Sequence, residues 1–134
     1  MIEKLYSLKK IQSDQKMMFR AEIMNSIDLY NEQIEELKKS ITTASVDRFG
    51  AISDFKVLEI HKNTLKMNVR KLESQRSVLL VKLKKLNAEI VELQKQKEQY
   101  AYILDEQKKE AFKKILKEEE EASSEFVQSK YIVG

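Results

Sequence analysis

The sequence predicts an all-α fold, an antiparallel two-helix coiled-coil hairpin with an overhanging C-terminal helix. The first observation is the scarcity of helix breakers, because the 134 residues include no Pro and two Gly, where an average chain would carry about sixteen. The second is composition, with 35% charged and 42% hydrophobic residues, which is typical of long helices and coiled coils. The third is a heptad pattern in the second half of the chain. We expect a single domain over residues 1–134.

A first helix is predicted over residues 2–41. Its apolar residues recur at steps of three and four, which keeps them on one face of an α-helix. They are Phe19, Ile23, Ile27, Tyr30, Ile34, Leu37 and Ile41. Upstream, the face is less apolar and we expect looser packing; its residues are Leu5, Leu8, Gln12 and Gln15.

Residues 42–53 are predicted to connect the two helices. Thr and Ser residues cluster at the start of this segment, and their hydroxyls compete for backbone hydrogen bonds, which favours helix ends. Gly50 is the only interior glycine and supplies backbone freedom for a bend. Ser53 or Asp54 is a suitable N-cap for the next helix.

A second helix is predicted over residues 54–121, and its heptads are the strongest pattern in the chain. With Phe55 at position a, thirteen of seventeen consecutive a and d positions are apolar, counting Ala and Tyr. Such a run predicts a left-handed coiled coil. The positions are Phe55, Leu58, Lys62, Leu65, Val69, Leu72, Arg76, Leu79, Leu83, Leu86, Ile90, Leu93, Lys97, Tyr100, Leu104, Gln107 and Ala111. We expect Leu79, Leu83 and Leu86 to be buried.

Beyond Ala111 the heptads lose their phase. Phe112, Ile115 and Leu116 form a separate apolar stripe, and the run Glu118–Glu121 that follows is acidic. We expect residues 122–134 to be a frayed tail.

Two helices joined by a short connection should pair antiparallel. If the bend is centred at residues 46–47, residue i faces about residue 94 − i. Residues 22–36 carry five acidic and no basic residues, and the predicted partner segment, 58–72, carries four basic residues and one acidic residue. This complementarity favours the hairpin. The same rule leaves the second helix unpaired from Leu93 onward.

Toward the chain termini the same pairing predicts like charges facing each other. We interpret this concentration of basic residues either as a solvated face or as a docking site for an acidic partner surface. The candidate residues are Lys9, Lys10, Lys82, Lys84 and Lys85.

Several classes of function are not expected. The absence of Cys excludes disulfides and thiolate chemistry and is compatible with the cytoplasm, and no segment has the pattern of a signal peptide or a membrane span. His61, the only histidine, occupies a position flanking the seam. We therefore expect no catalysis, no metal and no cofactor. A net charge of +3 without interleaved aromatic residues does not favour nucleic acid binding.

The hairpin proportions, the single bend and the late segment QKKEAFKKILKEEEEA resemble the FliJ family of flagellar type III export proteins. The resemblance covers roughly residues 1–125. It implies a cytoplasmic coiled-coil stalk, associated peripherally with the inner-membrane export apparatus of the bacterial flagellum. Its implied partners are the hexameric export ATPase (FliI-like), the membrane export gate protein (FlhA-like) and export chaperones.

The resemblance also suggests two contact regions. A gate contact near the bend would use Tyr30, Leu37, Phe55 and Leu58, and an ATPase-ring contact would use the five lysines named above. Two alternatives remain open: a generic coiled-coil tether or dimerisation module, and a stalk protein of a virulence type III secretion system. A prefoldin-like arm is less compatible, because the connection is too short to form the two strands that such an arm needs.

Overall fold

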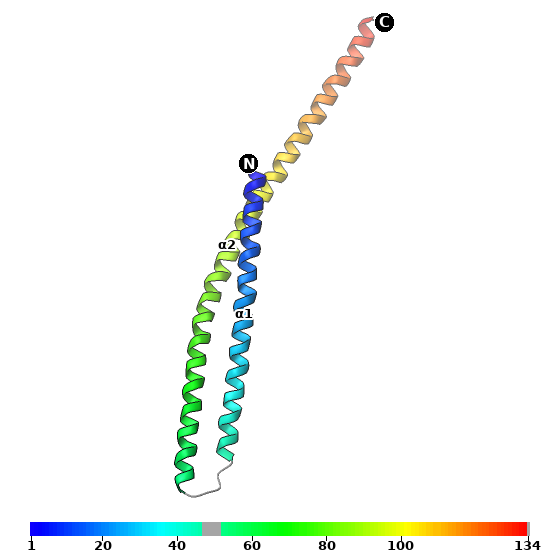
Figure 1. The fold of residues 1–134 in the computed structure, drawn as a ribbon. Helices are drawn as coiled ribbons and strands as arrows, with labels where there is room; N and C mark the ends of the chain where they lie inside the picture. The colour runs from blue at the N-terminus through cyan, green and yellow to red at the C-terminus, as the bar shows by residue number, and fades with distance from the viewer. Residues whose placement is uncertain (47–51, 134) are drawn as a thin grey trace. The chain divides into compact units, whose positions relative to one another are not determined.

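A computed structural model of the chain describes residues 1–46 and 52–133. The described residues form two long helices, α1 (Ile2–Val46) and α2 (Ile52–Val133), and contain no strand. The two helices run in opposite directions (Figure 1). Side chains of α1 form ion pairs and hydrogen bonds with side chains of α2. The predicted all-α helical hairpin is therefore confirmed.

The helix ends differ from the prediction. α1 continues to Val46 instead of ending at residue 41, because the hydroxyls of Ser40, Thr42 and Thr43 donate to backbone carbonyls four residues earlier, at 3.0, 3.1 and 3.0 Å. These side chains bond within the helix and do not terminate it. Part of the predicted connection, including Gly50, lies outside the described residues.

α2 also differs from the prediction at both ends. It begins at Ile52, before the predicted N-caps, and continues to Val133 instead of ending at residue 121. Residues 122–133 therefore belong to the helix. Their sequence has no Gly or Pro before Gly134, so no residue in it breaks a helix.

The packed helices divide into two units. Unit 1 comprises Met1–Ser13 and Glu92–Gly134, and unit 2 comprises Asp14–Val91. Each unit therefore contains one stretch of α1 and one stretch of α2.

Unit 2 contains the most apolar part of the interhelical seam. Its buried apolar residues are Ile27 and Ile34 of α1 and Val69, Leu86 and Ile90 of α2. Of the three leucines expected to be buried, Leu86 is 8% exposed, whereas Leu79 and Leu83 are half-buried. Two helices cannot enclose every seam position, so partial burial of neighbouring a and d residues is the expected geometry.

The heptads of α2 agree with the burial of its side chains. Every a and d position from Leu58 to Leu104 is buried or half-buried. Phe55 at the start, and Gln107 and Ala111 at the end, are exposed. The seam on α2 therefore follows the predicted phase for about seven heptads.

The seam on α1 also follows a heptad pattern. Only some of its positions belong to the predicted apolar stripe. Phe19 is 54% exposed, and Arg20 beside it is half-buried. Every seam position from residue 2 to residue 44 in this phase is buried or half-buried. These positions are Ile2, Tyr6, Lys9, Ser13, Lys16, Arg20, Ile23, Ile27, Tyr30, Ile34, Leu37, Ile41 and Ala44.

The register of the two helices in unit 2 also differs from the prediction. Lys16 Nζ lies 3.0 Å from a carboxylate oxygen of Glu89. Arg20 donates to Asn87 Oδ1 at 3.5 Å, and Arg76 donates to Asn31 Oδ1 at 2.8 Å. Residue i therefore faces about residue 106 − i, not 94 − i.

The register difference is close to two heptads. A continuous heptad seam matches itself again after each shift of seven residues, so the apolar pattern alone does not choose between such registers. The start of α2 extends past the end of α1 (Figure 1), whereas the predicted rule assumed that the helices pair directly from the bend.

Candidate protein-interaction surfaces

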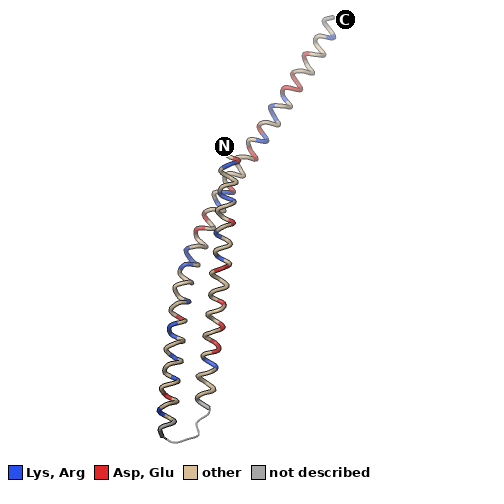
Figure 2. The backbone as a smooth tube through the Cα atoms, in the orientation of Figure 1, with Lys and Arg blue, Asp and Glu red and all other residues tan. Residues whose placement is uncertain are grey.

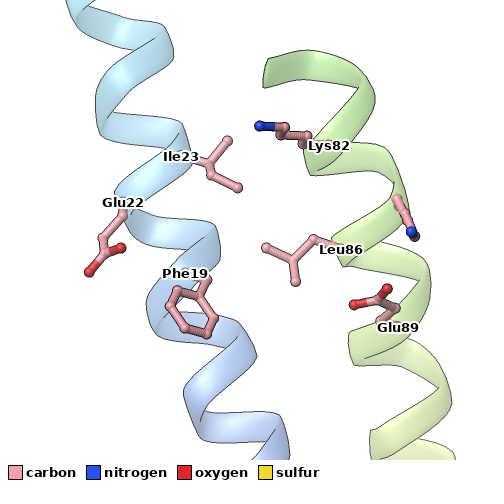
Figure 3. Close-up of a pocket in the computed structure, with 7 residues that line it drawn as sticks. Phe19, Glu22, Ile23, Lys82, Leu86 and Glu89 are labelled. Atoms are coloured by element: carbon pink, nitrogen blue, oxygen red, sulfur yellow. The ribbon is translucent and has the colours of Figure 1, made fainter. Parts of the chain in front are cut away.

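A shallow groove of about 290 Å³ lies between α1 and α2 in unit 2 (Figure 3). Ile23 and Leu86 point into the space between the helices and form its apolar floor. Phe19 lies at one edge and is 54% exposed. Charged residues complete the lining: Glu22, Lys82, Lys85 and Glu89.

In the observed register, the groove lies where an acidic segment of α1 runs beside a basic segment of α2. The α1 segment 22–36, with five acidic and no basic residues, faces about residues 70–85. That stretch of α2 carries six basic residues and one acidic residue. Figure 2 shows acidic residues of α1 running beside basic residues of α2 in unit 2.

The five lysines predicted to form one basic site are distributed over both units. Lys82, Lys84 and Lys85 belong to unit 2, whereas Lys9 and Lys10 belong to unit 1. The α2 stretch of unit 1 carries Glu92 and Glu98 as well as lysines. The expectation of like charges facing each other is wrong, because it depended on the 94 − i register.

The four residues predicted for the gate contact are likewise divided. Phe55 and Leu58 line a second groove of about 350 Å³ near the start of α2, and Phe55 is 44% exposed. Tyr30 and Leu37 are half-buried at seam positions. Asn31, the neighbour of Tyr30 on α1, accepts a hydrogen bond from Arg76 of α2. Tyr30 therefore lies beside a part of α2 that is well separated along the helix from the groove.

The second groove is otherwise polar. Its remaining lining residues are Glu59, Lys62, Asn63 and Lys66. His61 is exposed on the same stretch of α2. Phe55 and Leu58 are therefore the apolar part of a surface that otherwise carries charge of both signs.

Unit 1 contains a long stretch of α2 that α1 does not cover. The predicted overhang begins at Leu93, but Leu93, Tyr100 and Leu104 are half-buried beside the first turns of α1. Every side chain from Gln107 to Tyr131 is exposed. We call residues 107–133 the C-terminal arm.

The C-terminal arm exposes large apolar side chains along one side. Phe112, Ile115 and Leu116 are 62%, 52% and 42% exposed, and Phe126 and Val127 are 70% and 49% exposed. Their spacing of three to four residues, and of eleven from Ile115 to Phe126, places them on one side of the helix. The sequence indicated the first three but not the last two, because residues 122–134 were expected to fray.

No known protein family, curated protein or solved structure matches this chain. Neither α1 nor α2, over the residues described, contains a stretch apolar enough to cross a membrane. Within the same described residues, no three His, Cys, Asp or Glu side chains are grouped to hold a metal ion.

Proposed function

We propose that this protein is a non-enzymatic coiled-coil stalk of a bacterial flagellar protein-export apparatus. In this role it couples the ring of an export ATPase to the membrane export gate and assists the delivery of chaperone-bound substrates. The observation that carries the proposal is a packed helical pair in which α2 continues as a bare helix with exposed apolar residues. A soluble helix does not usually expose such a stripe unless another molecule covers it.

The C-terminal arm is the strongest candidate for contact with the ATPase ring. It is a single helix about 40 Å long at 1.5 Å per residue, and it exposes Phe112, Leu116 and Phe126. A narrow helix with apolar and charged residues on its surface suits insertion into the centre of a ring. Lys82 and Lys85 line a groove that also contains Glu22 and Glu89, so this surface carries charge of both signs.

The groove at Phe55 and Leu58 is the better candidate for the gate contact. It combines two apolar side chains with charged and polar ones, and protein-binding sites commonly contain both. Through such a contact the protein would be cytoplasmic and attached to the inner membrane only by its partner.

The proposal is tested by mixing the purified protein with an export ATPase, with and without nucleotide, and following complex formation by sedimentation. Phe112→Glu with Leu116→Glu should abolish the complex. Val81→Glu is the matched control, because Val81 is 71% exposed on unit 2 and the change should leave binding intact. Circular dichroism should show the same helicity in all variants. If the ATPase does not bind the wild-type protein in either nucleotide state, the stalk proposal is wrong.

The gate contact has a separate test. Phe55→Ala should weaken binding to the cytoplasmic domain of an export gate protein, whereas Val57→Ala should not. Val57 is 66% exposed and does not line the groove. Equal binding by both variants would remove the groove from the proposal.

A further inference from the structure

The C-terminal arm carries its charges in two halves. Residues 108–117, the basic half, hold five lysines and one glutamate. Residues 118–125, the acidic half, hold five glutamates and no basic residue. All of these side chains are exposed, so the arm is a bare helix with opposite charge at its two halves.

Only a few of these charges are paired within the chain. Lys109 lies 3.3 Å from Asp105 and 3.8 Å from Glu106, just before the arm. No ion pair is recorded within the described residues for the acidic half. The glutamates of the acidic half therefore form no ion pair in the described part of the chain. Lys114 and Lys117 lie one turn from Glu118 and Glu121 along the helix.

The apolar stripe lies between charged flanks of the same halves. On a helix with 100° between successive residues, the side chains of Phe112, Leu116 and Phe126 fall within a sector of about 80°. Lys113, Lys117 and Glu120 flank this sector on one side, and Glu118 and Glu125 flank it on the other. Lys114 and Glu121 lie on the opposite face of the helix, and Glu119 falls inside the sector.

A partner that fits this surface must offer an apolar stripe, an acidic half opposite the basic half, and a basic half opposite the acidic half. A second copy of the arm, placed antiparallel, has all three features. A parallel copy would place lysines against lysines and glutamates against glutamates, which is destabilising. The charge pattern therefore discriminates between the two orientations.

The apolar stripe and the charge pattern indicate similar centres for antiparallel pairing. The charge changes sign between Lys117 and Glu118. A dyad near residue 119 places Phe112 of one copy opposite Phe126 of the other. The two centres lie within about two residues of each other.

We propose that the C-terminal arms of two copies of this protein pair antiparallel, forming a symmetric dimer centred near Glu119. The interface covers the apolar stripe of each arm and places the basic half of one copy against the acidic half of the other. The seam is narrow and contains Glu119 itself, so the dimer is weak and reversible. The proposal does not depend on the stalk function, because no other protein takes part.

The first experiment measures the mass of the purified full chain by sedimentation equilibrium over a concentration series. Two variants remove the complementarity. The acidic-arm variant carries Lys113→Glu, Lys114→Glu and Lys117→Glu, and the basic-arm variant carries Glu120→Lys, Glu121→Lys and Glu125→Lys. Each cross-arm pair occurs twice in a symmetric dimer and contributes a factor of about two, so each variant should self-associate at least about fourfold more weakly.

The matched control combines all six substitutions, which reverses the charge of three residues in each half and keeps the composition of the arm. This combined variant should dimerise as the wild type does, and a mixture of the acidic-arm and basic-arm variants should form a heterodimer. A chain that stays monomeric up to about 1 mM overturns the proposal. Dimerisation that persists unchanged in the acidic-arm variant also overturns it, because the interface would then lie elsewhere.

The second experiment determines the orientation. The chain has no cysteine, so a single introduced cysteine carries one spin label. In the antiparallel dimer, labels at Glu118 lie close together across the dyad, whereas labels at Gln128 are about 27 Å apart along the axis. Short distances for both labels would indicate a parallel dimer and overturn the proposal.

Discussion

Ile90 offers the most direct test of the seam, because an exposed aliphatic residue stands next to it. Ile90 is 2% exposed, and Val91 is 60% exposed. Ile90→Ala removes three buried carbon atoms, worth about 0.8 kcal/mol each. The helices cannot fully collapse onto the space, so a cavity term adds to the loss. We expect a decrease of about 2.5–4 kcal/mol in the free energy of unfolding.

The measurement is urea unfolding followed by circular dichroism at 222 nm. The midpoint should fall in Ile90→Ala while the slope stays near the wild-type value. Val91→Ala is the control and should change the free energy by less than about 0.5 kcal/mol. If the two variants unfold at the same midpoint, Ile90 does not lie in a closed seam and the packing of unit 2 described above is wrong.

Three further predictions test the register and the polar seam. A disulfide between cysteines introduced at Asn31 and Arg76 should form within one chain, as a mobility shift without a dimer band shows; only intermolecular products would contradict the register. Ser13→Ala should raise the free energy of unfolding by about 1 kcal/mol, because Ser13 is 1% exposed and its Oγ has no hydrogen-bond partner in the described part of the chain. A lower free energy of unfolding in urea would contradict this prediction. Lys82→Glu with Lys85→Glu should lower the melting temperature at low salt and less at high salt, and an unchanged melting temperature would show that these lysines do not interact with the acidic residues of α1.

The sequence predicted the helical fold and the phase of the α2 seam, because thirteen apolar residues at heptad positions leave little choice of face. It did not reveal the full seam of α1. A search for apolar residues passes over Lys9, Lys16 and Arg20, which are half-buried at seam positions. Long basic side chains can bury their aliphatic stems while the charge stays in water, so such positions carry no hydrophobic signal.

The sequence did not predict the register between α1 and α2, for a related reason. The acidic segment 22–36 meets a basic stretch both at residues 58–72, as predicted, and at residues 70–85, as observed. Charge complementarity and heptad phase are nearly satisfied by both alternatives. Specific contacts such as Arg76 to Asn31 distinguish them, and these depend on side-chain geometry that a one-dimensional pattern does not contain.

The observed register also changes which residues are candidates for interaction surfaces. The predicted basic site depended on like charges facing each other, and the shift places acidic residues opposite Lys82 and Lys85. The exposed stripe on the C-terminal arm was recognised in part, through Phe112. Phe126 was missed because a short polar segment at a chain end usually frays, whereas here the helix continues through it.

The α1 seam of unit 1 is less apolar than that of unit 2. In unit 1, the α1 positions Lys9 and Ser13 bury little apolar surface, and an unsatisfied hydroxyl adds a cost. Local stability follows buried apolar contacts, so the first turns of α1 are held less firmly than the stretch that contains the buried isoleucines of unit 2. Release of these turns would expose Leu93, Tyr100 and Leu104 and extend the apolar stripe of the C-terminal arm toward the hairpin. A partner that bound this longer stripe would compete with the first turns of α1 for the same side chains of α2.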